Sequence, residues 1–382
     1  MTSRDDLDHS PVVVAALRTP IGTAGRSLAG VDAAGLAAPV LAALAAAVPG
    51  EPVAEVVLGN CMGPGGNVAR VAALAAGLPP EVPALTVDRQ CGSGLAAITT
   101  AAALVRANSG LVLAGGTESA STAPWRFWPP VEGAEPIRYE RAPFAPAELG
   151  DPEMGLAADL LALERGVSRE RQDAYAARSH ARAYATLQAG GFHRETVAVG
   201  GVATDERPRP GMTAERLGRL RPAFRDGGTV TAGNSCGVND GAAAVAVVDA
   251  ETHRRLGVPG LRILATATAG VDPNRPGLGP VPAVRVALDR AGLTLDDVDV
   301  VEINEAFAGQ VLACCDELGL DPDRVCPEGG ALALGHPWGA SGAVLVVRLF
   351  SQLIRAERED IGLAAIAVGG GQGIALVVRR SP

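Results

Sequence analysis

Two apolar segments recur at distant places in this chain, and the repeat limits which folds the chain can adopt. Leu111–Gly116, LVLAGG, resembles Ile366–Gly371, IAVGGG. Ala242–Val248, AAAVAVV, resembles Gly373–Val378, GIALVV. One residue separates the two strings in the second copy, whereas residues 117–241 separate them in the first. We interpret this pattern as a duplicated half with a long insertion in its first copy.

Strand and helix patterns alternate outside the insertion. Pro11–Ala16 and Val53–Leu58 are apolar runs of strand length, and Leu111–Ala114 is another. Asp32–Val48 is alanine-rich and is predicted to be helical despite Pro39. Strands that are apolar on both sides and alternate with helices predict layered α/β halves.

The intervening stretch has a different character. It is rich in proline, arginine and aromatic residues, and it contains one clear amphipathic helix from Ser168 to about Gln188, which Ser168 can cap. We therefore predict three parts: residues 1–118 with 239–258 as the N-terminal half, 119–238 as an inserted loop domain, and 259–382 as the C-terminal half.

Charge and residue usage exclude several functional classes. The net charge is −9 and the pI is about 5.2, which argues against nucleic acid or an anionic membrane as the main partner. The sequence contains no lysine, so Schiff-base chemistry, pyridoxal phosphate anchoring and a lysine-bearing P-loop are excluded.

Cysteine and histidine spacing indicates neither a disulfide framework nor a metal site. The six cysteines form no CxxC pair and the five histidines no HExxH motif. The polar opening MTSRDDLDHS is unlike a targeting sequence, and no stretch has the length and apolar character of a membrane span. We expect a cytoplasmic protein with reduced thiols and no metal.

Cys91 lies in Val87–Ile98, VDRQCGSGLAAI, between a short strand and the start of a long apolar helix. Unpaired N–H groups and the positive end of the helix dipole are expected to push its thiol toward thiolate. The neighbouring glycines are expected to let another molecule approach the backbone. The alternative is an inert buried thiol.

Further motifs accompany Cys91 in a fixed order. They are NEAFA from Asn304, GGALALGHPWGASGA from Gly329 and AVGGGQG from Ala367, together with VVVAALRTPIG, MGLAADLLALERGVSRERQ and GTVTAGNSCGVNDGAAAV. In order and spacing these motifs resemble the thiolase family of acyl-CoA acyltransferases. The resemblance implies a duplicated five-layer αβαβα sandwich, with the loop domain closing over coenzyme A or substrate.

The resemblance also implies roles for individual residues. Cys91 accepts the acyl group, and His336 takes its proton and later helps to hold the thioester oxygen. Asn304 positions a water beside that histidine. The backbone N–H groups of Cys91 and Gly369 form an oxyanion hole. Contacts to substrate or coenzyme A are implied for Met154, Arg221, Cys236 and Phe307, with Arg221 near a phosphate or the adenine.

Two positions depart from the family pattern. Ala367 stands where common thiolases carry the cysteine that removes the α-proton of the acceptor, and alanine cannot do this. Cys236 stands where the family has serine, and it is interpreted either as neutral packing or as a replacement acid/base. Glu153, before Met154, replaces the usual histidine or asparagine and is expected to alter which acyl chain fits.

The sequence thus predicts an acyltransferase that loads Cys91 from an acyl-CoA or acyl-carrier-protein thioester and forms a C–C bond by an atypical route. Either the acceptor loses CO₂ to generate its own carbanion, or the acceptor is already an activated nucleophile. The alternatives are an ordinary acetyl-CoA acetyltransferase or 3-ketoacyl-CoA thiolase that uses another base, and a catalytically impaired acyl-CoA-binding scaffold. No cofactor is expected beyond coenzyme A in the substrate, and a homodimer or homotetramer is expected.

Some residues also have purely structural interpretations. Glu305 is a candidate for capping the helix that follows it, and Cys314 and Cys315 are expected in the core. Arg178 and His180 are expected on the solvated side of their helix. The glycine-rich stretch 59–69 is either a surface loop or a subunit contact.

Overall fold

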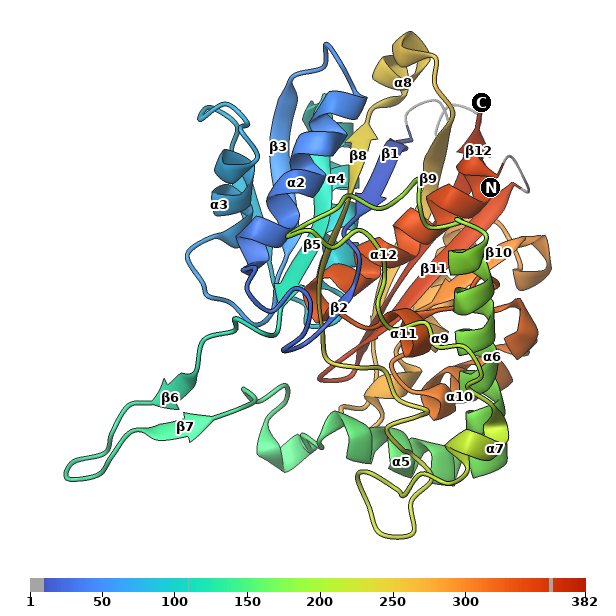
Figure 1. Cartoon of the computed structure of the whole chain (residues 1–382). Coiled ribbons are helices and arrows are strands. Elements are labelled where there is room, and N and C mark those ends of the chain that lie inside the picture. The colour runs from blue at the N-terminus through green and yellow to red at the C-terminus, as the bar shows by residue number, and fades with distance from the viewer. Residues whose placement is uncertain (1–9, 109, 357–359) are drawn as a thin grey trace.

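The computed structural model describes residues 10–108, 110–356 and 360–382, so nearly all of the polar opening stretch lies outside it. Within these residues the main sheet has ten strands in the order β10-β11-β12-β9-β1-β8-β5-β3-β4, with β2 paired to β8 (Figure 1). The strands are β1 Val12–Arg18, β2 Gly22–Thr23, β3 Val53–Gly59, β4 Ala84–Val87, β5 Leu111–Ser119, β8 Asn239–Val248, β9 Gly260–Gly270, β10 Val300–Ile303, β11 Ile361–Val368 and β12 Gln372–Ser381.

The sheet consists of two halves joined by a short pairing. Only Val12 and Val13 of β1 pair with β9, through Arg262 and Leu261, whereas β1 pairs with β8 along most of its length. The repeated strings occupy equivalent places, because β5 is antiparallel to β8 in one half and β11 is antiparallel to β12 in the other.

Helices cover both faces of both halves. The long helices are α2 Ala33–Ala47, α3 Val68–Ala75, α4 Ser93–Asn108, α5 Met154–Glu164, α6 Arg169–Gln188, α9 Pro280–Ala291, α10 Ala308–Leu318 and α12 Trp338–Phe350. The shorter elements are α7 Ala214–Leu217, α8 Ala250–Leu256, α11 Ala331–Leu334 and a π-helical turn, Ser351–Arg355. No helix in the part of the chain that the structure describes is long and apolar enough to cross a bilayer.

Alternation along the strands builds three separate cores. In β8, Val245 and Val247 face a central core that contains α4 and α12, while Ala244 and Ala246 face an outer core with α2 and α3. A third core packs α9 and α10 against the outer face of the other half. Successive strand residues point to opposite faces, so each half is covered on both sides. This arrangement confirms the predicted five-layer sandwich.

Side chains at the start of α2 and α6 accept hydrogen bonds from the first turn of each helix. The Asp32 carboxylate accepts from Gly35 N at 2.7 Å and begins α2, and Ser168 Oγ accepts from Arg171 N at 3.2 Å and begins α6. Pro39 lies inside α2 without ending it.

The insertion between β5 and β8 contains a hairpin, a 3-10 helix (Ala147–Leu149) and three α-helices. The hairpin strands β6 (Arg126–Trp128) and β7 (Ile137–Tyr139) project from the body of the molecule, while α5, α6 and α7 lie along the C-terminal half (Figure 1). The boundaries 118/119, 238/239 and 258/259 remain predictions.

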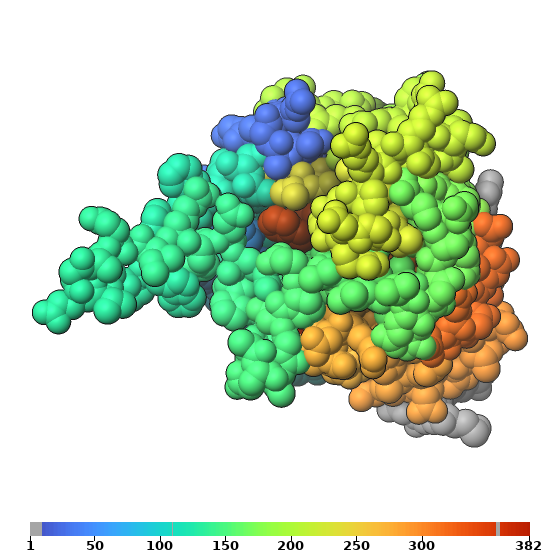
Figure 2. All heavy atoms as spheres, turned by 90° about the horizontal axis from the view of Figure 1, so that it is seen from below, coloured from blue at the N-terminus to red at the C-terminus, as the bar shows by residue number. Residues whose placement is uncertain are grey.

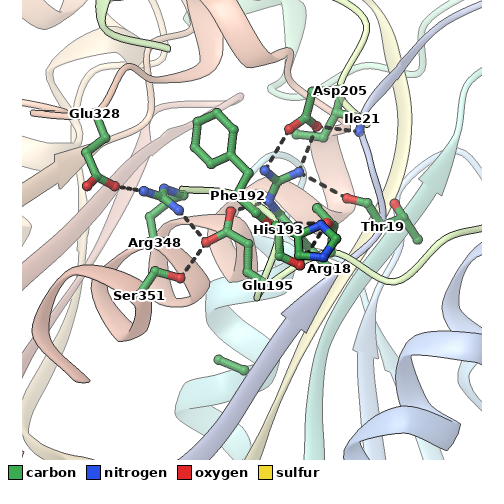
Figure 3. A network of polar contacts seen from close by, with 12 residues as sticks. Arg18, Thr19, Ile21, Phe192, His193, Glu195, Asp205, Glu328, Arg348 and Ser351 are labelled. Carbon is green, nitrogen blue, oxygen red and sulfur yellow. Dashed lines mark hydrogen bonds and ion pairs between the residues drawn. The ribbon is translucent and has the colours of Figure 1, made fainter. Parts of the chain in front are cut away.

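A buried ionic network ties the inserted segment to both halves (Figure 3). Arg18, at the end of β1, donates to Glu195 at 2.7 Å and forms a bidentate pair with Asp205 at 2.7 and 2.8 Å. Arg348, in α12, donates to Glu195 from the other side and also pairs with Glu328. Glu195 therefore bridges two arginines that belong to different halves.

The Phe192 ring lies between the same two cations. Its centroid is 5.2 Å from the Arg18 guanidinium carbon and 4.8 Å from that of Arg348. Such contacts are favourable when desolvated. Because Arg18 and Glu195 are wholly buried, removal of one member leaves a charge that water cannot solvate.

We expect Glu195→Gln to lower the free energy of unfolding by about 3–5 kcal/mol, because two buried guanidinium groups then lose their shared carboxylate. Urea denaturation measures the change. The control is Asp316→Asn, which removes an ion pair with Arg171. The Asp316 and Arg171 side chains are 43% and 41% exposed, so this variant should change the free energy of unfolding by no more than ~0.5 kcal/mol. Equal losses in both variants would contradict the role of the network.

Candidate active site

A pocket of about 110 Å³ brings together most of the residues singled out in the sequence. Its lining includes Cys91, Met154, Cys236, Phe307, His336, Ala367 and Gly369. Figure 2 shows a hollow with red-brown atoms of the C-terminal half at its bottom and atoms of the inserted segment around its rim. Both halves and the insertion thus contribute to one site.

Cys91 is held in a tight turn between β4 and α4. Gln90 has a left-handed backbone (φ 46°), and its carbonyl accepts from Ser93 Oγ at 2.6 Å. A Cβ on Gly92 would lie 2.6 Å from the Val368 side chain. The expectation that this glycine admits another molecule is therefore corrected, because the space is taken by β11 of the other half.

The expected shift of the Cys91 thiol toward thiolate is wrong for the free protein. Burial raises its pKa to about 12, and the Glu118 carboxylate adds to the rise. The backbone N–H groups of Cys91 itself and of Gly369 donate toward the sulfur and lower the pKa, but burial dominates. The resting side chain is a neutral thiol that remains partly accessible through the pocket.

His336 is fixed by contacts on its backbone and its ring. Its N–H donates to Asn239 Oδ1 at 2.9 Å, and its Nδ1 lies 2.5 Å from Ser341 Oγ. Gly335, before it, has φ 116°, and a Cβ there would lie 2.6 Å from the Asn239 side chain. Since Asn239 begins β8, the N-terminal half positions a histidine of the C-terminal half.

The imidazole of His336 is neutral. The residue is 2% exposed, and burial lowers its pKa to about 4. Its Nε2 has no hydrogen-bond partner among the described residues. A neutral imidazole with one free ring nitrogen can accept or donate one proton, according to its tautomer.

Asn304 lies elsewhere than the other predicted residues. It is buried and lines a second, smaller cavity with Ser341 and Glu302, rather than the pocket that contains Cys91. Its backbone N–H donates to Ala365 O at 3.0 Å, which fixes the end of β10 against β11. Its predicted water-positioning role stays a prediction.

Cys236 belongs to the pocket but lacks an acidic thiol. Burial raises its pKa to about 12, the proximity of Cys91 adds to the rise, and the Arg207 guanidinium opposes it. Its N–H donates to Ala306 O at 2.9 Å, beside the NEAF motif. Its position allows contact with a substrate, while its pKa favours the neutral form.

Of the four predicted ligand contacts, three line the pocket, namely Met154, Cys236 and Phe307, and Arg221 does not. Phe224 meets the Phe307 ring edge-on, with centroids 6.1 Å apart, and a Cβ on Gly155 would lie 2.2 Å from the Phe224 ring. Arg221 is exposed and is not part of the pocket lining. Glu153 lies just before α5, and its carboxylate is 3.3 Å from Arg141.

Three of the structural interpretations are corrected. Glu305 does not cap α10, because its carboxylate accepts from Ser179 Oγ at 2.6 Å and from Leu332 N, in α11, at 3.1 Å. His180 is 4% exposed, so it is not solvated. Arg178 covers the Tyr175 ring and pairs with Asp323, with only 19% of its side chain exposed.

The core placement of Cys314 and Cys315 is confirmed, since both are wholly buried in α10.

Ser341 is a site residue that the sequence reasoning missed. It follows His336 by five positions in the same GHPWGAS string, and a hydroxyl at the start of an otherwise apolar helix was the available signal.

The thiol, the neutral imidazole and the N–H donors near the sulfur are groups that a cysteine-dependent acyltransferase site requires. Residues 11–251 match the family model "Thiolase, N-terminal domain" and residues 258–380 match "Thiolase, C-terminal domain". The chain belongs to the thiolase family.

Relatives of known name are similar over nearly the whole chain. An acetyl-CoA acetyltransferase of Pseudomonas aeruginosa is 44% identical and covers 97% of this chain and 99% of its own length. A putative acetyl-CoA C-acetyltransferase of Bacillus subtilis, YhfS, is 44% identical, with 96% and 98% covered. The crystal structure of human mitochondrial 3-ketoacyl-CoA thiolase in complex with CoA superposes with a TM-score of 0.91 at 36% identity, covering 98% of this chain and 99% of the other.

We expect His336→Asn to slow alkylation of Cys91 by iodoacetamide at pH 7.5 by a factor on the order of 10²–10⁴, because the thiol then loses its proton acceptor. Peptide mass spectrometry measures the rate at Cys91 itself. His193→Asn, at an exposed histidine, is the control and should react like the wild type. An unchanged rate in His336→Asn would show that another group takes the proton.

Proposed function

We propose that this chain transfers an acyl group from an acyl-CoA thioester to Cys91 and then to a second acyl-CoA. This is the reaction class of the acetyl-CoA acetyltransferases that it resembles. The observation that carries the proposal is the shared pocket of Cys91 and His336, with the N–H groups of Cys91 and Gly369 directed at the sulfur. The same two N–H groups are available to the carbonyl oxygen of an acyl group on that sulfur.

Small apolar side chains limit the size of the acyl group. Ala157, Ala158 and Pro276 line the pocket beside Met154 and Phe307, and the cavity of about 110 Å³ suits a short chain. The reaction needs no cofactor beyond the coenzyme A of the substrate. An acyl-carrier-protein thioester would reach the same thiol through the same opening.

The second step needs a base that removes a proton from the acceptor. Among the described residues that line the pocket, Cys91, Cys236 and His336 titrate, and Ala367 faces the same space. Once Cys91 carries an acyl group, only His336 and Cys236 can remove a proton from the acceptor. The names of the relatives favour this ordinary condensation or thiolysis with a substitute base.

A second candidate follows from Ala367 itself. An acceptor that loses CO₂ generates its own carbanion and needs no proton-abstracting side chain. A malonyl-type acceptor therefore fits a pocket in which the position of the family's second cysteine carries a methyl group.

Incubation with acetoacetyl-CoA plus coenzyme A, and separately with acetyl-CoA plus malonyl-CoA, distinguishes the candidates. We expect thiolysis of acetoacetyl-CoA, an acetyl adduct on Cys91, and a gain of up to about 10²–10⁴-fold in condensation for Ala367→Cys, because a positioned thiol is restored. Release of CO₂ from malonyl-CoA at a rate that Ala367→Cys does not change would instead favour the decarboxylative route. A chain that never carries an acyl adduct would overturn both candidates and support a binding scaffold.

We also propose that the chain is a homodimer or homotetramer. The projecting β6–β7 hairpin carries large apolar side chains that are about half exposed or more, at Trp125, Phe127, Trp128, Val131 and Ile137. Apolar patches of this kind mark protein contacts more often than free surface.

We expect the double variant Val131→Asp, Ile137→Asp to form a smaller assembly, either a dimer in place of a tetramer or a monomer in place of a dimer. The reason is that charged side chains on the hairpin are costly to bury in a subunit contact. Light scattering after size exclusion measures the mass. Leu163→Asp, on α5 and 64% exposed, is the control. A monomeric wild type would contradict the proposal.

A further inference from the structure

The contact between His336 and Ser341 permits two arrangements of protons. If Nδ1 carries the proton, it donates to Ser341 Oγ and leaves Nε2 free to accept from the pocket. If the hydroxyl donates to Nδ1, Nε2 carries a proton and donates into the pocket. The first state suits removal of the Cys91 proton, and the second suits donation to a leaving group. Exchange between them requires a proton path on the Ser341 side.

A small cavity lies on that side. It measures about 10 Å³, which is room for roughly one water molecule. Its polar lining comprises Glu302, Asn304, Ser341 and Arg348, and none of these residues lines the pocket that contains Cys91. The serine that touches His336 therefore also lines a separate cavity between buried residues.

Two wholly buried polar atoms in the lining residues have no hydrogen-bond partner among the described residues. They are Glu302 Oε2 and Arg348 Nε. Both side chains are otherwise engaged: Glu302 Oε1 accepts from Gln352 Nε2 at 2.6 Å, and Arg348 pairs with Glu195 and Glu328. A water in the cavity would accept from Arg348, donate to Glu302 and meet Ser341, which is the usual number of partners for a buried water.

Burial also makes a charged imidazole costly. It lowers the pKa of His336 to about 4, while it raises the pKa of Glu302 to about 7, the range in which a carboxyl exchanges protons most readily at physiological pH. A proton that leaves Cys91 is therefore held more favourably on Glu302 than on His336.

We propose that Glu302 is a positioning residue that accepts and returns the catalytic proton through one water and Ser341, so that His336 stays neutral. We call this path the Ser341–Glu302 relay. It deepens the proposed acyl transfer, but it concerns only proton movement at Cys91 and requires no particular acyl substrate.

Every proton transfer in the relay breaks one bond to hydrogen and forms another. The S–H bond of Cys91 breaks as Nε2–H forms, and Nδ1–H breaks as its proton joins Ser341 Oγ. The original hydroxyl proton passes to the water, which gives one of its own protons to Glu302 Oε2. One thiol becomes a thiolate and one carboxylate becomes a carboxylic acid. The reverse sequence protonates the departing thiolate of coenzyme A.

Burial is the largest influence on the pKa of Glu302, and four neighbouring groups also shift it. Arg348 in α12 and Gln352 in the π-helical turn favour the carboxylate, as does Cys326, while Glu305 disfavours it. Glu302 is ionised above its pKa and can then accept a proton. Below that pKa it is already protonated, and the relay cannot run toward thiolate.

The test is the pH profile of Cys91 alkylation by iodoacetamide between pH 5 and 10, followed by peptide mass spectrometry. In the wild type we expect the rate to rise tenfold per pH unit up to an inflection near pH 7, the pKa of Glu302, and then to level off. In Glu302→Gln the inflection should vanish. The rate should then keep rising tenfold per unit, as for a plain thiol of pKa about 12, with at least a tenfold loss at pH 8.

Two further variants keep the test decisive. Ser341→Ala retains Glu302 but breaks its link to His336, so it should also lose the inflection. Glu305→Gln, at a buried carboxyl that does not line the cavity, should retain the inflection and move it to lower pH, because a like charge near Glu302 is removed. Circular dichroism verifies the fold of each variant.

A wild-type profile without an inflection between pH 6 and 8, or the same inflection in Glu302→Gln or Ser341→Ala, would overturn the relay. Because alkylation uses no thioester, this outcome is separate from any failure of the proposed acyl transfer. An intact relay with no acyl adduct from any acyl-CoA would count against the proposed function alone.

Discussion

The site depends on a backbone-to-backbone contact between the two central helices. A Cβ on Gly94, in α4, would lie 2.8 Å from Gly339 O, and a Cβ on Gly342, in α12, would lie 2.5 Å from Leu95 N. Only glycine permits such an approach without displacing the backbone. Since Cys91 precedes α4 and His336 precedes α12, the contact that joins the halves also places thiol and imidazole in one pocket.

Dry packing around this contact determines the electrostatics of the pocket. The same exclusion of water raises the pKa of Cys91 and lowers that of His336, so the free protein holds two neutral groups rather than a thiolate–imidazolium pair. Charge then arises at Cys91 only when its proton has an acceptor to move to.

Local sequence was sufficient for some features and insufficient for others. Asp32 and Ser168 begin their helices through contacts within three residues, and continuous apolar runs predicted strands that are covered on both faces. The acidity of Cys91 could not be inferred in this way, because Val368 and Glu118, which surround it, come from remote segments.

In helix α6, local sequence also failed to show which side is buried, because the buried face carries polar residues. Gln172, Ser179 and His180 lie on that face, and the first two have buried partners at Val167 and Glu305, so apolar periodicity assigned His180 to the wrong side. Glu302 and Ser341 are 39 positions apart in sequence, and only the cavity that they share relates them.

The bond from His336 N to Asn239 has a consequence for how the molecule loses activity. Because strand β8 of one half orients the histidine of the other, neither half contains a working site by itself. Partial loosening at the junction should abolish turnover before either sheet melts. Thermal inactivation should therefore precede the main calorimetric transition, so that the junction between the halves, rather than the two outer cores, sets the temperature at which activity is lost.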